Sequence, residues 1–109
     1  MLTFTSNPRI FLYQDKMDMR KGFESLSAIV ESSYSVEITS GAYFIFLNKK
    51  QDRMKIIYWD NDGLAIWYKR LEKGKFIRVN HKKNTLSRSD FFMLLEGITP
   101  KKINNRYKN

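Results

Sequence analysis

Alternating and clustered apolar positions predict five strands along the chain. Apolar runs rich in β-branched and aromatic residues occupy positions 9–13, 42–47, 54–59, 64–68 and 75–79, and such runs are typical of strands. The 54–59 and 64–68 runs flank Asp60-Asn61-Asp62-Gly63. An Asp-Gly pair in this position indicates a hairpin, because glycine adopts positive φ without steric cost. We therefore expect an antiparallel meander with a central hairpin.

Between the first two predicted strands, the apolar residues are spaced as in a helix. Met19, Phe23, Leu26 and Val30 recur on one face of a helix. Asp18 precedes them and can accept a backbone N–H that the first helical turn leaves unpaired. The first helix is therefore expected to begin at Asp18.

A second helix is predicted near the C-terminus. Ser87 and Asp90 form a start that resembles a capping box, and Leu86 and Phe91 have the spacing of a hydrophobic staple. Gly97 then favours a helix end. The expected fold is one α+β domain over residues 1–98, an antiparallel sheet of about five strands packed against two helices. A mobile, basic tail is expected over residues 99–109.

The hairpin strands carry apolar residues on both faces of the predicted sheet. Ile56 and Tyr58 alternate with Ile57 and Trp59, so the two pairs cannot share a face. Most of these aromatic side chains are expected in the core. Two helices cover only part of both faces, and a remaining aromatic patch would be a site for a partner.

Composition excludes several kinds of site. The 109 residues include no cysteine and one histidine, His81, which excludes disulfides, thiolate catalysis, Cys-based zinc sites and a multi-His metal site. No apolar run is long enough to span a bilayer, and the N-terminus lacks the pattern of a secretory signal. We expect a cytoplasmic protein with no cofactor.

Positive charge is concentrated in the middle of the chain. The formal net charge is +9, and residues 49–88 hold twelve basic and four acidic residues, a net +8. Such a block is either a solvated face or a surface for a polyanion, with nucleic acid the first candidate and an acidic protein the second.

The predicted hairpin gathers part of this charge. Arg53 and Lys55 begin one strand, and Lys69 and Arg70 end the next, so the turn at 60–63 brings the four cations together. Three further cations follow in the chain, namely Lys73, Lys75 and Arg78. A polyanion would relieve the repulsion among these like charges.

No catalytic constellation accompanies the basic residues. Asp52, Asp60 and Asp62 fall in predicted turns, where Asp is favoured for its local hydrogen bonds; a nuclease site made of the three is the minor alternative. His81 lies in a polar loop with no serine or carboxylate placed beside it by any motif. These residues predict no enzyme and no metal site.

An ordered series of motifs between residues 9 and 98 resembles one family. The residues are Asp18-Met19-Arg20-Lys21-Gly22-Phe23 with Leu26, Asp52-Arg53 with Lys55-Ile56, Trp59-Asp60-x-Asp62-Gly63, Tyr68-Lys69-Arg70-Leu71-Glu72-x-Gly74-x-Phe76, and Leu94-Leu95-Glu96-Gly97-Ile98. In this order they resemble the TnpB accessory protein of IS-sixty-six-type bacterial insertion sequences, which is distinct from the RNA-guided nuclease of the same name. The charged residues shared with the family pattern are Arg20, Lys21, Arg53, Lys55, Lys69 and Arg70.

The resemblance implies a role in DNA transposition beside a separate, larger transposase, without an assigned catalytic centre. The leading hypothesis is a non-enzymatic factor that holds the phosphates of insertion-sequence ends or of DNA in general. The expected contacts are Arg20, Lys21, Arg53, Lys55, Lys69, Arg70, Lys73, Lys75 and Arg78. The alternative is a protein–protein adaptor that docks the transposase or other element-encoded proteins with little DNA contact. Neither hypothesis involves a membrane or a small-molecule substrate, and the resemblance implies association with the bacterial nucleoid if the protein binds DNA.

Overall fold

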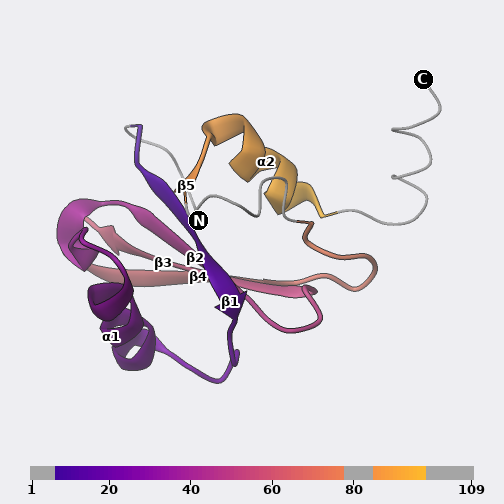
Figure 1. Cartoon of the computed structure of the whole chain (residues 1–109), viewed down its shortest axis with the longest axis horizontal. Helices are drawn as coiled ribbons and strands as arrows, with labels where there is room; N and C mark the ends of the chain where they lie inside the picture. The colour runs from indigo at the N-terminus through magenta and orange to yellow at the C-terminus, as the bar shows by residue number, and fades with distance from the viewer. Residues whose placement is uncertain (1–6, 78–84, 98–109) are drawn as a thin grey trace.

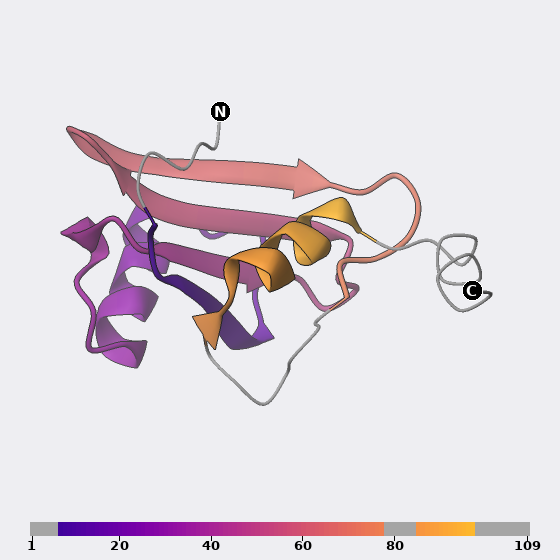
Figure 2. The same ribbon diagram turned by 90° about the horizontal axis from the view of Figure 1, so that it is seen from above.

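A five-stranded sheet with one helix on each face organises the chain (Figures 1 and 2). The computed structural model describes residues 7–77 and 85–97. The strands are β1 (Ile10–Lys16), β2 (Tyr43–Leu47), β3 (Arg53–Asp60), β4 (Gly63–Arg70) and β5 (Thr85–Leu86), in the spatial order β4-β3-β2-β1-β5. The helices are α1 (Phe23–Ser33) and α2 (Arg88–Glu96), with a short 3₁₀ turn at Ile38–Ser40. The predicted α+β class is confirmed.

The first strand departs from the expected all-antiparallel meander. Strands β2, β3 and β4 do form an antiparallel meander, but β1 pairs parallel with β2, in a register that sets Ile10 beside Tyr43. Parallel neighbours need a crossover connection, and α1 with the 3₁₀ turn supplies it. The sheet is therefore mixed, because the helix predicted before the central strands returns the chain to the same end of the sheet.

The fifth strand is β5 and not the predicted 75–79 segment. In the described part of that segment, Lys75 forms an isolated bridge and Phe76 is buried. The Phe76 N–H donates to the Gln51 carbonyl at 2.7 Å, so the segment crosses the end of the sheet at the β2–β3 turn. Strand β5 instead pairs antiparallel with β1, with Leu86 opposite Ile10. Residues 78–79 lie outside the described residues.

The first helix begins later than its periodicity indicates. It starts at Phe23 after Gly22, with no side-chain cap, so the predicted start at Asp18 is wrong. The Asp18 carboxylate accepts from the Arg20 N–H at 2.9 Å and stabilises a turn ahead of the helix. Leu26 and Val30 are buried as predicted, whereas Phe23 is 50% exposed.

The second helix follows the sequence prediction closely. The Ser87 hydroxyl accepts from the Asp90 N–H at 3.1 Å, which confirms the N-cap. Gly97 ends the helix with φ at +69°, a conformation that L side chains rarely adopt. Leu86 and Phe91 are both buried in the core on this side of the sheet. Ile98, the last position of the predicted face, lies outside the described residues, as does the 99–109 tail.

Successive side chains of β3 point to opposite faces of the sheet, so β3 contributes to the apolar core beneath each helix. Ile56 and Tyr58 pack in the cluster that contains Phe91 of α2, whereas Ile57 packs in the cluster that contains Leu26 of α1. The prediction that both faces are apolar is confirmed, since the two helices lie on opposite faces. None of the helices in the described part of the chain is long and apolar enough to cross a membrane.

Candidate nucleic-acid interface

The strand register divides the four cations at the base of the hairpin between the two faces of the sheet. Arg53 lies directly opposite Arg70, and Lys55 follows two residues later on the same face, the face that α1 covers. Lys69 lies opposite Met54, whose side chain belongs to the core beneath α2. The four cations therefore meet at one end of the hairpin, but Lys69 is on the other face.

Lys55 has a structural role at this end. Its side chain is 9% exposed, and its ammonium donates to the Lys21 carbonyl at 2.7 Å. The same ammonium lies 4.8 Å from the centre of the Tyr68 ring, a favourable cation–π position. Lys55 thus holds the loop between β1 and α1 against the sheet, and this burial disfavours it as a phosphate contact. Lys21 itself has an exposed side chain on that loop.

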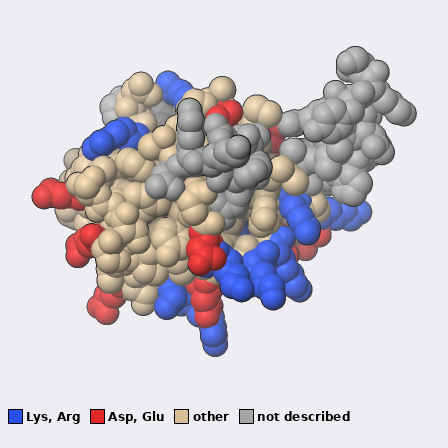
Figure 3. Space-filling model, in the orientation of Figure 1, with Lys and Arg blue, Asp and Glu red and all other residues tan. Residues whose placement is uncertain are grey.

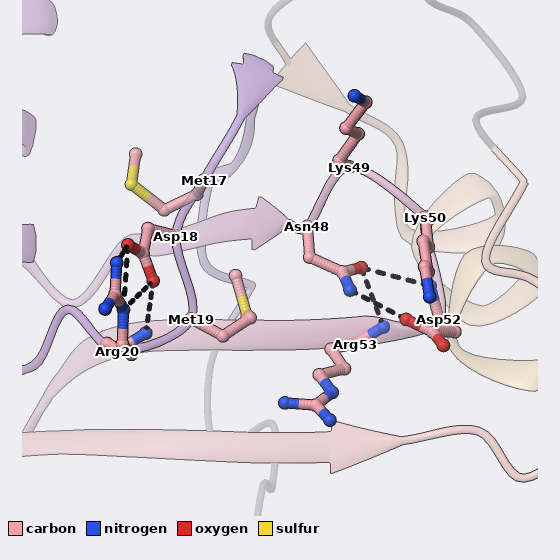
Figure 4. Close-up of a pocket in the computed structure, with 9 residues that line it drawn as sticks. All are labelled: Met17, Asp18, Met19, Arg20, Asn48, Lys49, Lys50, Asp52 and Arg53. Atoms are coloured by element: carbon pink, nitrogen blue, oxygen red, sulfur yellow. Dashed lines mark hydrogen bonds and ion pairs between the residues drawn. The ribbon is translucent and has the colours of Figure 1, made fainter.

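An open hollow of about 480 Å³ lies where this loop meets the β2–β3 turn. Four cations line it, namely Arg20, Lys49, Lys50 and Arg53. The other lining residues are Met17, Asp18, Met19, Asn48 and Asp52. Figure 4 shows Arg20 on one side of the hollow, and Lys49, Lys50 and Arg53 on or beside the turn.

Both carboxylates of the hollow are held by neighbouring side chains. The Arg20 guanidinium hydrogen-bonds to Asp18, with an N–O distance of 2.7 Å, and holds the pKa of that carboxyl well below its usual range. The Asn48 amide donates to Asp52 at 2.7 Å and lowers the pKa of Asp52 in the same way. Hydrogen bonds to the ionised form are the cause in both cases. The exposed Lys49 and Lys50 make neither of these contacts.

The segment after β4 brings two more cations to the same turn. The Leu71 N–H donates to the Asp52 carbonyl at 2.8 Å, and the Gln51 side-chain amide donates to the Phe76 carbonyl at 2.8 Å. These hydrogen bonds place the exposed Lys73 and Lys75 beside the β2–β3 turn. Arg78 lies outside the described residues.

We call this surface the basic end of the sheet. It comprises Arg20, Lys49, Lys50, Arg53, Lys69, Arg70, Lys73 and Lys75. Figure 3 shows Lys and Arg side chains gathered over the β2–β3 turn. Lys49 and Lys50 were not among the residues predicted from the sequence. The sequence shows them as two adjacent lysines in a polar turn. Only the structure places this turn at the centre of the basic surface, because segment 71–77 crosses beside it.

The three turn aspartates do not come together. Asp52 precedes β3 and Asp60 ends it, so β3 separates them by its eight residues, on the order of 25 Å at 3.4 Å per residue. One metal site cannot use carboxylates at both ends of a strand, so the minor nuclease hypothesis is wrong for these residues. Within residues 7–77 and 85–97, no three His, Asp or Glu side chains gather as a possible metal site.

Comparisons with known proteins give one family. The model of the family described as IS66 Orf2-like protein matches residues 8–105. The uncharacterized protein y4jC of Sinorhizobium fredii (strain NBRC 101917 / NGR234) is 36% identical over 92 residues, which cover 83% of this chain and 79% of the relative. The uncharacterized protein y4hO of the same organism is 31% identical over 100 residues, which cover 90% and 87%. No solved structure matches.

Proposed function

The chain belongs to the IS66 Orf2-like family of insertion-sequence proteins, and from that premise we propose that it is a non-catalytic accessory protein of transposition that binds DNA through the basic end of its sheet. The observation that carries the proposal is the open hollow that Arg20, Lys49, Lys50 and Arg53 line. An element that moves as DNA needs proteins that hold its ends, and phosphates are the groups that such a surface attracts.

The charge balance of the basic end supports this proposal. Its eight cations have three carboxylates among them: Asp18 pairs with Arg20, Asp52 accepts from Asn48, and Glu72 lies 3.2 Å from Arg70. Five positive charges therefore remain in excess. Because Lys49, Lys50, Lys73 and Lys75 are exposed, they can reach a phosphate backbone without rearrangement of the sheet.

The kind of contact determines what this surface contributes. Arginine and lysine contacts to phosphates fix the position of a protein on DNA but carry no sequence information. The basic end is therefore proposed to supply affinity and orientation, while recognition of particular insertion-sequence ends is left to the transposase.

A salt titration tests the proposal. The full chain is titrated against duplex and single-stranded DNA from insertion-sequence ends, and against scrambled DNA, at several salt concentrations. For duplex DNA the logarithm of the binding constant should fall against the logarithm of salt with a slope of about −0.9 per phosphate contact. An affinity that does not change with salt would contradict phosphate binding.

A matched pair of variants locates the surface. Lys49→Glu with Lys50→Glu should weaken binding at least tenfold and reduce the salt slope, because two contacts become repulsive. Arg9→Glu with Arg88→Glu makes the same change in net charge at the other end of the sheet, where β1 and α2 begin. Equal losses from the two double variants would show that net charge alone drives binding.

The adaptor alternative rests on a different surface. Phe92 and Met93 of α2 are 46% and 39% exposed, and exposed apolar side chains are common at protein interfaces. Co-purification with the transposase that survives nuclease treatment and Lys69/Arg70 charge reversal, but is lost in Phe92→Ser with Met93→Ser, would favour the adaptor.

A further inference from the structure

The two edges of the sheet differ in how well they are protected. The β5 edge is two residues long. The β4 edge is eight residues long and pairs with β3 in unbroken register from Asp60–Gly63 to Arg53–Arg70. Natural proteins blunt an edge strand with a short length, a bulge, a proline or a charge. Strand β4 has none of these before Lys69, so its outer edge resembles a strand that pairs with another chain.

The side chains of β4 also have apolar surface left to bury. Leu64, Ala65, Ile66 and Trp67 each pack against a core cluster on one side and remain partly exposed. Tyr68 is 48% exposed. A neighbouring strand would cover this surface on both faces of the sheet at once.

The hairpin geometry sets which backbone groups are available. Asp60 and Gly63 flank a two-residue turn, and in such a hairpin the flanking residues form a hydrogen-bonded pair and later pairs alternate. The N–H and C=O groups of Leu64, Ile66 and Tyr68 therefore point away from β3. Their spacing of two residues is the spacing that an antiparallel partner strand requires.

We propose that two copies of this chain associate through their β4 edges, antiparallel and about a two-fold axis at Ile66, so that the two five-stranded sheets become continuous. In this register Ile66 lies opposite Ile66 of the second copy. Leu64 lies opposite Tyr68 of the second copy, and the small Ala65 lies opposite its large Trp67. The large Trp67 thus faces a small residue on one face of the sheet, and the other face sets Ile66 against its own copy and Leu64 against Tyr68.

Charge complementarity favours a second copy of the chain as the partner of β4, and it favours antiparallel over parallel pairing. The register places Asp62, in the turn of one copy, opposite Arg70 of the second copy, so that the Arg70 guanidinium, 3.2 Å from Glu72 of its own chain, faces a second carboxylate. The two-fold axis repeats this arrangement. Parallel pairing in register would instead set Lys69 and Arg70 beside the same residues of the second copy, which is repulsive. The antiparallel arrangement keeps the two Arg70 residues roughly 27 Å apart at 3.4 Å per residue, beyond the screening length of physiological salt.

The molar mass in solution is the first test. Light scattering and sedimentation of the full chain, without DNA, should give about twice the 13.0 kDa of one chain. A mass of 13.0 kDa up to the highest soluble concentration would overturn the proposal. Since no DNA is present, this result is independent of whether the basic end binds DNA.

Single cysteines test the register, because the chain has none of its own. Ile66→Cys should form a disulfide between copies on mild oxidation, since directly opposed residues of a hydrogen-bonded pair have Cα atoms about 5.5 Å apart. Trp67→Cys is the control: two copies of position 67 lie roughly 8 Å apart in this register, too far to bridge. Crosslinking of Trp67→Cys in place of Ile66→Cys would contradict the Ile66-centred pairing.

A charge exchange uses exposed residues and so leaves the core intact. Asp62→Arg and Arg70→Asp should each weaken the dimer at least several-fold, because each places like charges opposite one another. The double variant, Asp62→Arg with Arg70→Asp, should restore the wild-type dissociation constant. Two single variants that dimerise as well as the wild type would overturn the proposed contact.

Discussion

Burial gives Lys55 a structural role that its position in the sequence does not reveal. In the sequence, Lys55 is one of four cations at the base of a hairpin. In the structure its ammonium donates to the Lys21 carbonyl and lies over the Tyr68 ring. A buried charge is tolerated only when it is hydrogen-bonded, and these contacts give Lys55 a role in stabilising the fold. Arg53, two residues earlier in β3, instead lines the hollow.

Replacement of Lys55 tests this structural role. Lys55→Met keeps the length and apolar stem but leaves the Lys21 carbonyl without its donor, and we expect a loss of about 1.5–3 kcal/mol in the free energy of unfolding. Lys69→Met, an exposed control one strand away, should change it by less than about 0.5 kcal/mol. Urea denaturation measures both. Equal effects from the two substitutions would contradict the structural role.

At the scale of elements, the β2–β3 turn organises the basic end. The Asn48 side-chain oxygen accepts from the N–H groups of Asp52 and Arg53 at 3.1 and 3.0 Å, while its amide donates to the Asp52 carboxylate. One side chain therefore closes the turn that presents Lys49 and Lys50. The segment 71–77 then crosses this turn through backbone hydrogen bonds with Gln51 and Asp52.

Asn48→Ala should loosen this turn. It removes three hydrogen bonds at a partly buried site, so we expect about 1–3 kcal/mol of destabilisation. It should also return the pKa of Asp52 toward its ordinary value and weaken DNA binding several-fold at a pH where the variant is folded. Asn48→Asp keeps the acceptor for the two N–H groups but sets a second carboxylate against that of Asp52, so it should raise the pKa of Asp52 and weaken DNA binding more than Asn48→Ala does. Denaturation and DNA titration of both variants check this order, and a DNA affinity equal to wild type in folded Asn48→Ala would refute it.

At the scale of the whole molecule, a sheet between two helices buries an apolar core on each of its faces. Tyr43 and Tyr58 lie in the core on the α2 side, with ring centres 5.0 Å apart. Desolvation by burial raises the pKa of both phenols. A raised pKa for an acid means that the folded state keeps protons that the unfolded chain releases.

The free energy of unfolding should therefore fall as pH rises above about 10, the ordinary pKa of tyrosine. Below that pH the contribution of these two groups is fully present. Tyr43→Phe and Tyr58→Phe remove the ionisable phenols, so each should reduce the alkaline loss of stability. Denaturation curves at pH 8 and at strongly alkaline pH measure the difference. A pH dependence unchanged in the double variant would show that other groups govern alkaline unfolding.

Local patterns in the sequence were sufficient to predict most of the helices, strands and turns. The hairpin at 60–63, the cap at Ser87 and the end of α2 at Gly97 were predicted from short-range chemistry, because each depends on residues within one turn. In the hairpin, however, the residue with positive φ is Asn61 and not the predicted Gly63, which pairs with Asp60 at the start of β4. Membership of the insertion-sequence family also follows from the order of the motifs, and the family match over residues 8–105 confirms it. The start of α1 was missed because periodicity extends into the Asp18 turn, where Asp18 and Arg20 satisfy each other.

Tertiary structure alone decided the arrangement of these elements and the composition of the basic end. The parallel pairing of β1 with β2, the two-residue β5 and the placement of the helices on opposite faces depend on contacts between distant residues. The same contacts bury Lys55, set Lys69 on the other face and bring segment 71–77 to Lys49 and Lys50. The sequence by itself determined how much positive charge the chain carries, whereas the register and burial determined which cations face solvent together, because these depend on the pairing of strands far apart in the chain.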